Sequence, residues 1–352
     1  MKKAFTLVFL MFTSLFFLLA LKDNPAQQQN NTSALLEYEK NTVDVFQKNV
    51  SSVVNISNIN VAHNAWTFDA VEIPAGAGSG FVWSGEGHII TNYHVAQAGD
   101  SFLVSFHGDE KQYRAKLVGA DPFKDIAVLK LEEMPSRLFP IQVGESKNLL
   151  IGQKAIAIGN PFGLDSTVTV GIISAINRKI DGIGGVKIHG MIQTDASINP
   201  GNSGGALIDS SGKLIGMNTM IYSGSGTSSG VGFAVPVDLI KRIVPQLIKH
   251  GKVVRPGLGI GIMENPYNEG LLITYIKGGG PADRAGLEGM RQDNWGRRFL
   301  GDTILAVDGK KVNTYDDIYN VLEAYNIGDT VEVTYQRQGK IKKTRLQLSQ
   351  AQ

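Results

Sequence analysis

The residues best suited to chemistry in this chain are a histidine, an aspartate and a serine, in the order His94, Asp125, Ser203. Ser203 lies in the glycine-rich run G-N-S-G-G, where missing side chains let a substrate backbone approach and let N–H groups point at one spot. His94 follows the strand-like run H-I-I-T, and Asp125 directly precedes the apolar run I-A-V-L. Together these residue types can perform nucleophilic catalysis, whereas each alone also fits a tight turn, a structural histidine or an acid at the start of a strand.

The elements that must position these residues are short strands. From about residue 43 to residue 236, short β-branched runs alternate with Gly, Asn, Asp and Ser, which predicts an all-β barrel or sandwich. After Pro236 the apolar residues change to a helical spacing, and this helix is expected to stop at Gly251. A second unit, 253–348, mixes strand-like runs with one helix, for which Thr314 is the expected N-cap.

The three strings T-N-Y-H-V, K-D-I-A-V-L and G-N-S-G-G-A-L resemble those of trypsin-like serine proteases, and closely resemble the Deg/HtrA branch. The resemblance covers residues 53–348. It implies a mainly β chain: a chymotrypsin-like double six-stranded β-barrel protease domain at 43–251, followed by an α+β PDZ domain at 253–350. This layout is similar to that of plant thylakoid-lumen members with one PDZ domain, and to that of membrane-anchored bacterial members.

The resemblance assigns catalytic roles within the first domain. His94 takes the proton of Ser203 and returns it to the leaving amine, while Asp125 orients the imidazole. The backbone N–H groups of Gly201 and Ser203 form the oxyanion hole. Asn202 stands where digestive relatives carry an acid that pairs with a freed N-terminus, so zymogen cleavage is not expected here.

Substrate selection and peptide binding are also implied by the resemblance. Ile198 and Ile221 would line an S1 pocket for small or medium aliphatic residues, although both also fit simple core packing. In the second domain a G-L-G-I loop would offer backbone N–H groups to the C-terminal carboxylate of a peptide. Its residues are Gly257, Leu258, Gly259 and Ile260. An insertion at 289–300 has no role that the sequence defines.

The N-terminus predicts export. Lys2 and Lys3 precede residues 4–21, whose only polar members are threonine and serine. This pattern fits either a cleaved signal peptide or an uncleaved membrane anchor, with residues 22–42 as a tether. We expect a bacterial periplasmic protein, soluble or anchored to the inner membrane, with a lumenal organelle compartment as the alternative.

Partners and cofactors follow from composition and from the resemblance. The 34 Lys and Arg nearly balance the 32 Asp and Glu, so no nucleic-acid partner is expected. With no Cys and no H-E-x-x-H spacing, neither a metal nor another cofactor is predicted, and a metal-dependent hydrolase lacks support.

The resemblance also implies a homotrimer, because relatives trimerise through N-terminal aromatic residues of the kind seen here at Trp66 and Phe68. Burial of these two side chains within one chain is the alternative. Whether trimers assemble further is left open.

The function implied is an ATP-independent serine endopeptidase that acts on misfolded or regulatory exported proteins by an acyl-enzyme mechanism. Unfolded polypeptides would be its substrates, and C-terminal peptides at the PDZ domain would recruit it or regulate it. A chaperone-like peptide-binding protein without proteolytic activity is the alternative. Intact His94, Asp125 and Ser203 argue against that alternative.

Overall fold

The computed structural model describes residues 34–63, 70–97, 99, 101–161, 166–182, 186–221, 230–265 and 269–351, with the side chains of 61–63, 70–75, 220 and 221 left undescribed. The predicted targeting segment 4–21, most of the predicted tether, Trp66 and Phe68 lie outside these ranges. In the described part of the chain, no helix is both long enough and apolar enough to cross a membrane.

The chain divides into two compact units, Met1–Asp44 and Val45–Gln352. The described part of the first unit holds the start of helix α2 (Glu37–Asn49), whose first turn carries Glu37 and Glu39 at the positive end of the helix dipole. The Glu39 carboxylate accepts a hydrogen bond from the Leu36 N–H group. Since α2 runs to Asn49, it continues past residue 42, where the sequence predicts the end of the tether, and it occupies residues 43–49, where the sequence predicts the start of the strand-rich region.

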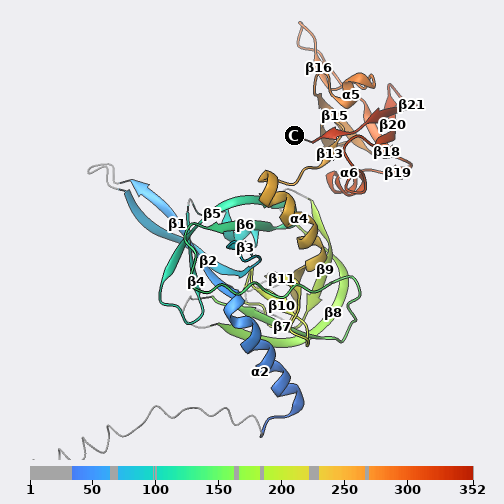
Figure 1. The fold of residues 1–352 in the computed structure, drawn as a ribbon. Helices are drawn as coiled ribbons and strands as arrows, with labels where there is room; N and C mark the ends of the chain where they lie inside the picture. The colour runs from blue at the N-terminus through green and yellow to red at the C-terminus, as the bar shows by residue number, and fades with distance from the viewer. Residues whose placement is uncertain are drawn as a thin grey trace, which may run out of the picture. The chain divides into compact units, whose positions relative to one another are not determined.

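The first barrel of the second unit closes in the order β1-β2-β3-β6-β5-β4 (Figure 1). Short helical turns precede, follow or join its strands: η2 (Val50–Ser52) before β1, α3 (Tyr93–Ala96) after β3, and η3 (Pro122–Lys124) between β5 and β6. The strands are β1 (Val53–His63), β2 (Ala70–Val82), β3 (His88–Thr91), β4 (Ser101–Phe106), β5 (Gln112–Asp121) and β6 (Ile126–Leu131).

The second barrel also has six strands and closes in the order β10-β11-β12-β9-β8-β7. Helix α4 (Val237–His250) follows it and ends at Gly251, whose φ of 72° is the left-handed conformation that glycine adopts readily. The two closed barrels confirm the predicted fold. The strands are β7 (Lys154–Gly159), β8 (Thr167–Asp181), β9 (Lys187–Thr194), β10 (Ala206–Ile208), β11 (Leu214–Ile221) and β12 (Gly232–Pro236).

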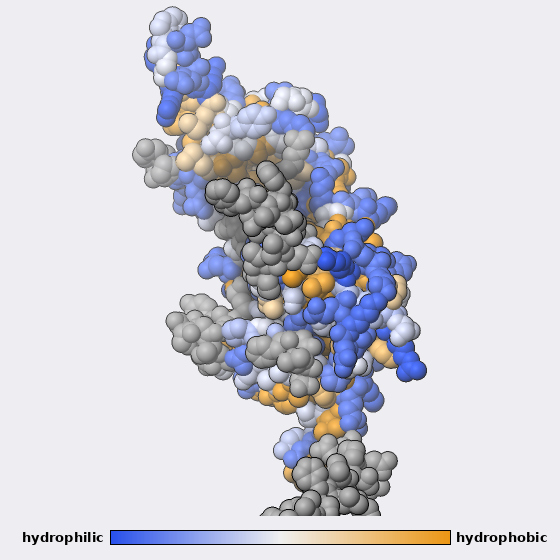
Figure 2. Space-filling model, turned by 90° about the vertical axis from the view of Figure 1, so that its left-hand side faces the viewer, coloured by the Kyte–Doolittle hydropathy of each residue, from blue (hydrophilic) through white to orange (hydrophobic). Residues whose placement is uncertain are grey.

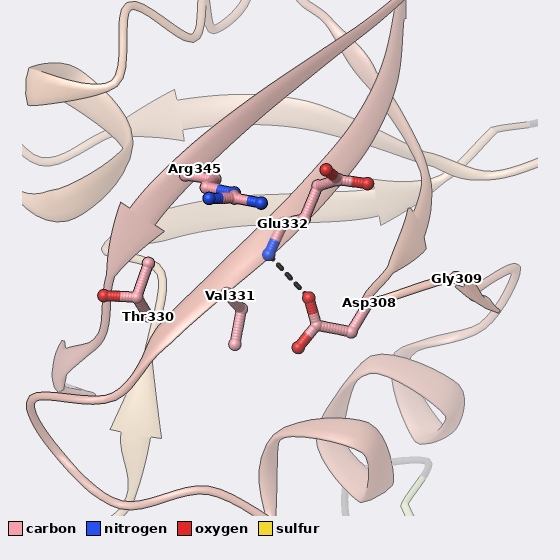
Figure 3. Close-up of a pocket in the computed structure, with 6 residues that line it drawn as sticks. All are labelled: Asp308, Gly309, Thr330, Val331, Glu332 and Arg345. Carbon is pink, nitrogen blue, oxygen red and sulfur yellow. Dashed lines mark hydrogen bonds between the residues drawn. The ribbon is translucent and has the colours of Figure 1, made fainter.

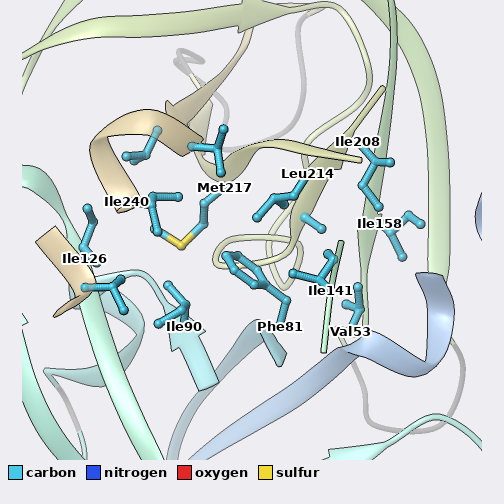
Figure 4. Packing of buried hydrophobic residues seen from close by; sticks show 14 of the residues in the cluster. Val53, Phe81, Ile90, Ile126, Ile141, Ile158, Ile208, Leu214, Met217 and Ile240 are labelled. Carbon is cyan, nitrogen blue, oxygen red and sulfur yellow. The ribbon is translucent and has the colours of Figure 1, made fainter. Parts of the chain in front are cut away.

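One hydrophobic cluster joins the two barrels (Figure 4). Phe81 and Ile90 enter it from the first barrel, while Ile158 and Met217 enter it from the second. All four side chains are completely buried. Removing this apolar area from water stabilises the contact between the barrels, so the cluster fixes how residues on one barrel face residues on the other.

The second domain, where a PDZ fold is expected, is built on a sheet in the order β14-β15-β18-β20-β21, with β19 paired to β18. Thr314 caps helix α6 (Tyr315–Leu322) in a capping box with Asp317, as the sequence predicts. The insertion at 289–300 contains the pair β16 (Arg291–Gln292) and β17 (Arg298–Phe299). The other elements are β13 (Pro256–Gly257), β14 (Ile260–Glu264), β15 (Leu271–Ile276), α5 (Pro281–Arg284), β18 (Thr303–Val307), β19 (Lys310–Lys311), β20 (Thr330–Arg337), β21 (Lys340–Gln347) and β22 (Ser349–Gln350).

The face drawn in Figure 2 is mainly hydrophilic, with apolar residues in separate groups. Among the described residues, alternate positions of β8 leave apolar side chains exposed, namely Val168, Val170 and Ile172. Scattered exposed apolar residues of this kind are normal on a folded protein.

Candidate active site

Asp125 lies where η3 meets β6 and is almost completely buried. Its backbone has a φ of 55°, a left-handed conformation that Asp and Asn tolerate better than most residues. This conformation ends the short helix and precedes the apolar strand, whose residues pack partly inside the first barrel and partly in the cluster between the barrels. The predicted strand-start acid is therefore held at a sharp change of chain direction.

The carboxylate of Asp125 binds His94 at two points. The His94 backbone N–H group donates to Oδ1 at 3.0 Å, and ring atom Nδ1 lies 2.9 Å from Oδ2 and 3.0 Å from Oδ1. The Asn92 side chain also donates to the Asp125 carbonyl at 3.0 Å, which ties the segment before His94 to the aspartate. With an acceptor at Nδ1, the ring is oriented so that Nε2 is left to take a proton from another group.

Ser203 contributes its hydroxyl from the second barrel. The Oγ atom donates to the Thr219 carbonyl at 2.6 Å, and the described residues show no hydrogen bond between Ser203 and His94. Catalytic hydrogen bonds are often formed only when substrate is bound, so this geometry is compatible with a nucleophile. For attack, the hydroxyl must turn away from the Thr219 carbonyl.

Thr219 is a site residue that the sequence did not reveal. Its hydroxyl donates to Asp125 Oδ2 at 2.5 Å, and its carbonyl accepts from Ser203. The residue is buried in β11, where a β-branched side chain has no distinguishing sequence signal. It connects the acid of one barrel with the serine of the other.

Two backbone N–H groups beside Ser203 are available for a ligand. Within the described residues, the N–H groups of Gly201 and Ser203 form no hydrogen bond, while that of Asn202 donates to Asn199 and that of Gly204 donates to Asn218. Gly201 has a φ of 94°, which requires glycine. The two free donors are those predicted for the oxyanion hole.

The side chain of Asn202 is fixed rather than free. It is buried, and its Oδ1 accepts a hydrogen bond from the Thr167 hydroxyl at 2.9 Å. The position that holds an ionised acid in digestive relatives is therefore occupied by a neutral amide bound to β8.

The two predicted S1 residues differ in what the structure describes. Ile198 is 1% exposed and packs in the core of the second barrel, where a Cβ on Gly232 would lie 2.7 Å from its Cγ1 atom. The side chain of Ile221 lies outside the described residues. The role of both as pocket residues stays a prediction.

The predicted carboxylate-binding residues run from Gly257 in β13, through Leu258 and Gly259, to Ile260 at the start of β14, which is an edge strand of its sheet. Gly259 has a φ of 72°, and Leu258 is buried in the PDZ core. In the described structure the Leu258 and Gly259 carbonyls accept hydrogen bonds, while their N–H groups have no partner. An unpaired edge strand beside free N–H groups is suited to adding a peptide strand.

A second feature of the PDZ domain is an open depression of about 600 Å³ (Figure 3). Asp308 faces it, and hydrogen bonds from the Glu332 N–H group and from the Tyr325 hydroxyl lower the pKa of its carboxyl. The carboxylate is thus occupied in holding the turn after β18. None of the predicted site residues lines this depression, whose wall is formed by Asp308, Gly309, Thr330, Val331, Glu332 and Arg345.

Comparison with known proteins identifies both domains. A family model for the trypsin-like peptidase domain matches residues 78–217, and a PDZ domain model matches residues 256–348. Protease Do-like 1, chloroplastic, of Arabidopsis thaliana is 50% identical over 298 residues, which cover 83% of this chain and 68% of that protein. This chain belongs to the Deg/HtrA family. As a Deg/HtrA protein it is a serine endopeptidase with one PDZ domain, which confirms the predicted family, fold and enzyme class.

Other Deg/HtrA proteins are similar over most of the chain. A probable periplasmic serine endoprotease DegP-like of Chlamydia trachomatis is 42% identical over 277 residues, but this chain spans only 52% of its length. The solved HtrA-type protease AlgW with decapeptide has a TM-score of 0.69 at 31% identity, covering 88% of this chain and 99% of that chain. A serine endoprotease from Yersinia pestis has a TM-score of 0.63 at 30% identity, over 88% and 98% of the two chains.

Proposed function

We propose that His94, Asp125 and Ser203 form the catalytic triad of this endopeptidase, with the N–H groups of Gly201 and Ser203 as its oxyanion hole. The observation that carries this proposal is the Asp125 carboxylate, which binds the His94 ring and backbone while Thr219 links it to the serine segment. A buried carboxylate with three hydrogen bonds to one site is an organised catalytic group rather than an ordinary surface acid.

The reaction follows from these positions. The Ser203 oxygen attacks the scissile carbonyl carbon as its proton moves to His94, and the carbonyl oxygen takes up negative charge facing the two free N–H groups. His94 then gives the proton to the leaving amine, which leaves an acyl-enzyme. Water, deprotonated by His94, attacks the ester, and the returning proton restores the Ser203 hydroxyl.

The test compares the wild-type full chain, purified in mild detergent, with Ser203→Ala on unfolded casein. We expect the variant to lose cleavage roughly a thousandfold or more while its melting temperature is unchanged, because only the nucleophile is removed. If neither protein cleaves, even with added hydrophobic C-terminal peptides, the triad assignment fails. Suppression of aggregation would then test the chaperone-like alternative.

For substrates we infer cleavage after small or medium aliphatic residues of unfolded exported polypeptides. Support comes from the apolar character of Ile198 and Ile221, which offer no acid to pair with a basic P1 side chain. Sequencing of the casein cut sites tests this preference directly. A majority of cuts after Lys or Arg would contradict it.

We further propose that the PDZ domain binds C-terminal peptides, that the chain is exported to a periplasm-like compartment, and that it assembles as a homotrimer. The edge position of β14 and the free N–H groups of the preceding loop support peptide binding. The apolar segment 4–21 supports export, and relatives carry periplasmic and chloroplastic names. The compartment and whether residues 4–21 anchor the chain are tested by cell fractionation.

A further inference from the structure

The hydroxyl of Ser79, in β2 of the first barrel, binds the turn that carries the nucleophile in the second barrel. Ser79 is completely buried. Its Oγ donates to the Gly201 carbonyl at 2.5 Å and accepts from the Asn160 N–H group at 2.8 Å. We propose that Ser79 is a positioning residue that holds the oxyanion hole in its active conformation, a proposal that rests on the triad and oxyanion hole assigned above.

The backbone of Ser79 is attached to the same turn. Its N–H group donates to the Ser203 carbonyl at 2.8 Å, and its carbonyl accepts from the Thr91 hydroxyl at 2.7 Å. Three polar groups of one residue thus connect the nucleophile segment, the Gly201 carbonyl and the strand that leads to His94. The Asn160 carbonyl is itself held by the Asn55 side chain at 2.8 Å, so the donor to the Ser79 hydroxyl is also fixed.

The Gly201 carbonyl needs an external partner because of its residue type. Glycine has no Cβ and adopts many backbone conformations at similar energy, so local sterics do not choose the direction of its peptide groups. The free N–H of Gly201 and its bound carbonyl belong to the same residue, at a φ of 94°. The N–H lies in the peptide group before the Gly201 Cα atom and the carbonyl in the peptide group after it. The Ser79 hydroxyl bond to this carbonyl and the Ser79 N–H bond to the Ser203 carbonyl together anchor the segment 201–203 at two points. Both oxyanion donors lie on this segment, and they must be held in place to stabilise charge in the transition state.

The sequence around Ser79 permits this close approach. A Cβ on Gly78 would lie 2.7 Å from Val95 Cγ1, and a Cβ on Gly80 would lie 2.9 Å from the Ile90 carbonyl. A Cβ on Gly204 would overlap the Ser79 carbonyl. Glycines on both sides of the contact thus let two backbones meet, and serine is the residue between them whose small side chain both donates and accepts a hydrogen bond.

The experiment compares full-length Ser79→Ala with Ser105→Ala. Ser105 is also a buried serine of the first barrel, in β4, and among the described residues its hydroxyl has one hydrogen-bond partner, the Gln112 side chain, which donates to it at 3.4 Å. The readouts are kcat and KM on a peptide substrate, and the affinity for a peptidyl boronic acid with a valine-like P1 group, which forms a tetrahedral adduct. We expect Ser79→Ala to lower kcat and boronate affinity each about 10- to 100-fold with KM within twofold. Ser105→Ala should change neither.

A purely structural role would lower the melting temperature and the amount of folded protein, but would leave kcat per folded molecule and boronate affinity unchanged, and that result overturns the proposal. If Ser79→Ala does not fold, Ser79→Cys decides, because a thiol fills the site but is a weak donor and acceptor. An unchanged kcat in Ser79→Cys also overturns the proposal. Whichever result the Ser79 variants give, casein cleavage by the wild type and its loss in Ser203→Ala test the proposed triad separately.

Discussion

Thr219 contacts both ends of the proposed triad through two different atoms. Its hydroxyl stabilises the Asp125 carboxylate, and its carbonyl holds the Ser203 hydroxyl away from His94 before substrate binds. The first contact adds a hydrogen-bond donor to the carboxylate that also binds the His94 ring. The hydrogen bond from Ser203 to the Thr219 carbonyl must break before the serine attacks. Thr219 therefore holds Ser203 before substrate binds and also binds the Asp125 carboxylate.

Replacing Thr219 by Val removes the hydroxyl and keeps the shape and the carbonyl. A hydrogen bond to a charged group is worth about 1.5–3 kcal/mol, so we expect kcat/KM to fall about 10- to 100-fold. Steady-state kinetics on a peptide substrate measures this. Thr219→Ser, which keeps the hydroxyl, is the control and should stay near wild type; a Val variant within twofold of wild type would show that the contact is dispensable.

The three residues proposed for the triad could be predicted from the sequence because their types and local strings are distinctive, and the two proposed N–H donors followed from the family resemblance. Thr219 and Ser79 escaped prediction for a physical reason. Their roles arise where strands from distant parts of the chain meet, 94 residues apart for Thr219 and Asp125 and 122 residues apart for Ser79 and Gly201. Nothing in a threonine or a serine within a strand indicates which remote backbone it will contact.

At the scale of elements, the cluster between the barrels determines how the site is assembled (Figure 4). His94 and Asp125 belong to the first barrel and Ser203 to the second. Their mutual positions therefore depend on apolar packing between β2, β3, β7 and β11. The strands and the capped helices were predictable from residue periodicity, whereas the continuation of α2 past residue 42 was not, because its few apolar residues give no clear stripe.

A comparison of Phe81→Ala with Phe102→Ala distinguishes the effect of packing between the barrels from the effect of packing within one barrel. Both side chains are buried, but Phe81 lies in the cluster shared by the barrels and Phe102 in the core of the first barrel alone. Each change should cost about 3–5 kcal/mol of unfolding free energy. At a temperature where both variants are folded, we expect kcat to fall several-fold further in Phe81→Ala; equal kcat values in the two variants would contradict this.

His88 in β3 makes the stability of the first barrel depend on pH. Burial lowers the pKa of His88 below its ordinary value, Lys130 adds to this shift, and Glu86 opposes it. Below about pH 6.5 the unfolded chain therefore binds a proton that the folded chain resists, so stability is lost as pH falls from there toward the folded pKa. We expect the melting temperature to drop between pH 7.5 and pH 5.5, and to drop less in His88→Gln. Equal drops in both proteins would exclude His88 as the cause.

At the scale of the whole molecule, one chain combines a peptidase domain with a PDZ domain, for which we propose binding of C-terminal peptides. Gly259 has a φ of 72°, where a β-branched residue is strained, so Gly259→Val should distort the carboxylate-binding loop. We expect at least tenfold weaker binding of a hydrophobic C-terminal peptide, measured by fluorescence polarisation. Gly278→Val is the control, since a Cβ at Gly278 meets no atom within 4 Å. Unchanged affinity in Gly259→Val would contradict the assigned loop.

Assembly is the other property at this scale. If Trp66 and Phe68 join three chains, sedimentation equilibrium of the wild type should give three times the 38.0 kDa chain mass, and replacing both aromatic residues by Ala should give the mass of one chain. A wild-type monomer would contradict the proposed trimer. A double variant that stays trimeric would place the contact elsewhere.

Because the proposed site is divided between two barrels, it is assembled late in the synthesis and folding of the chain. During synthesis and export the first barrel emerges before the second, and at that stage the chain holds a histidine and an acid but no nucleophile beside them. A chain whose second barrel has formed without the first holds a serine without a base. With the triad proposed above, neither half-folded form can cleave a peptide bond, so proteolytic activity is gained only when both barrels have folded.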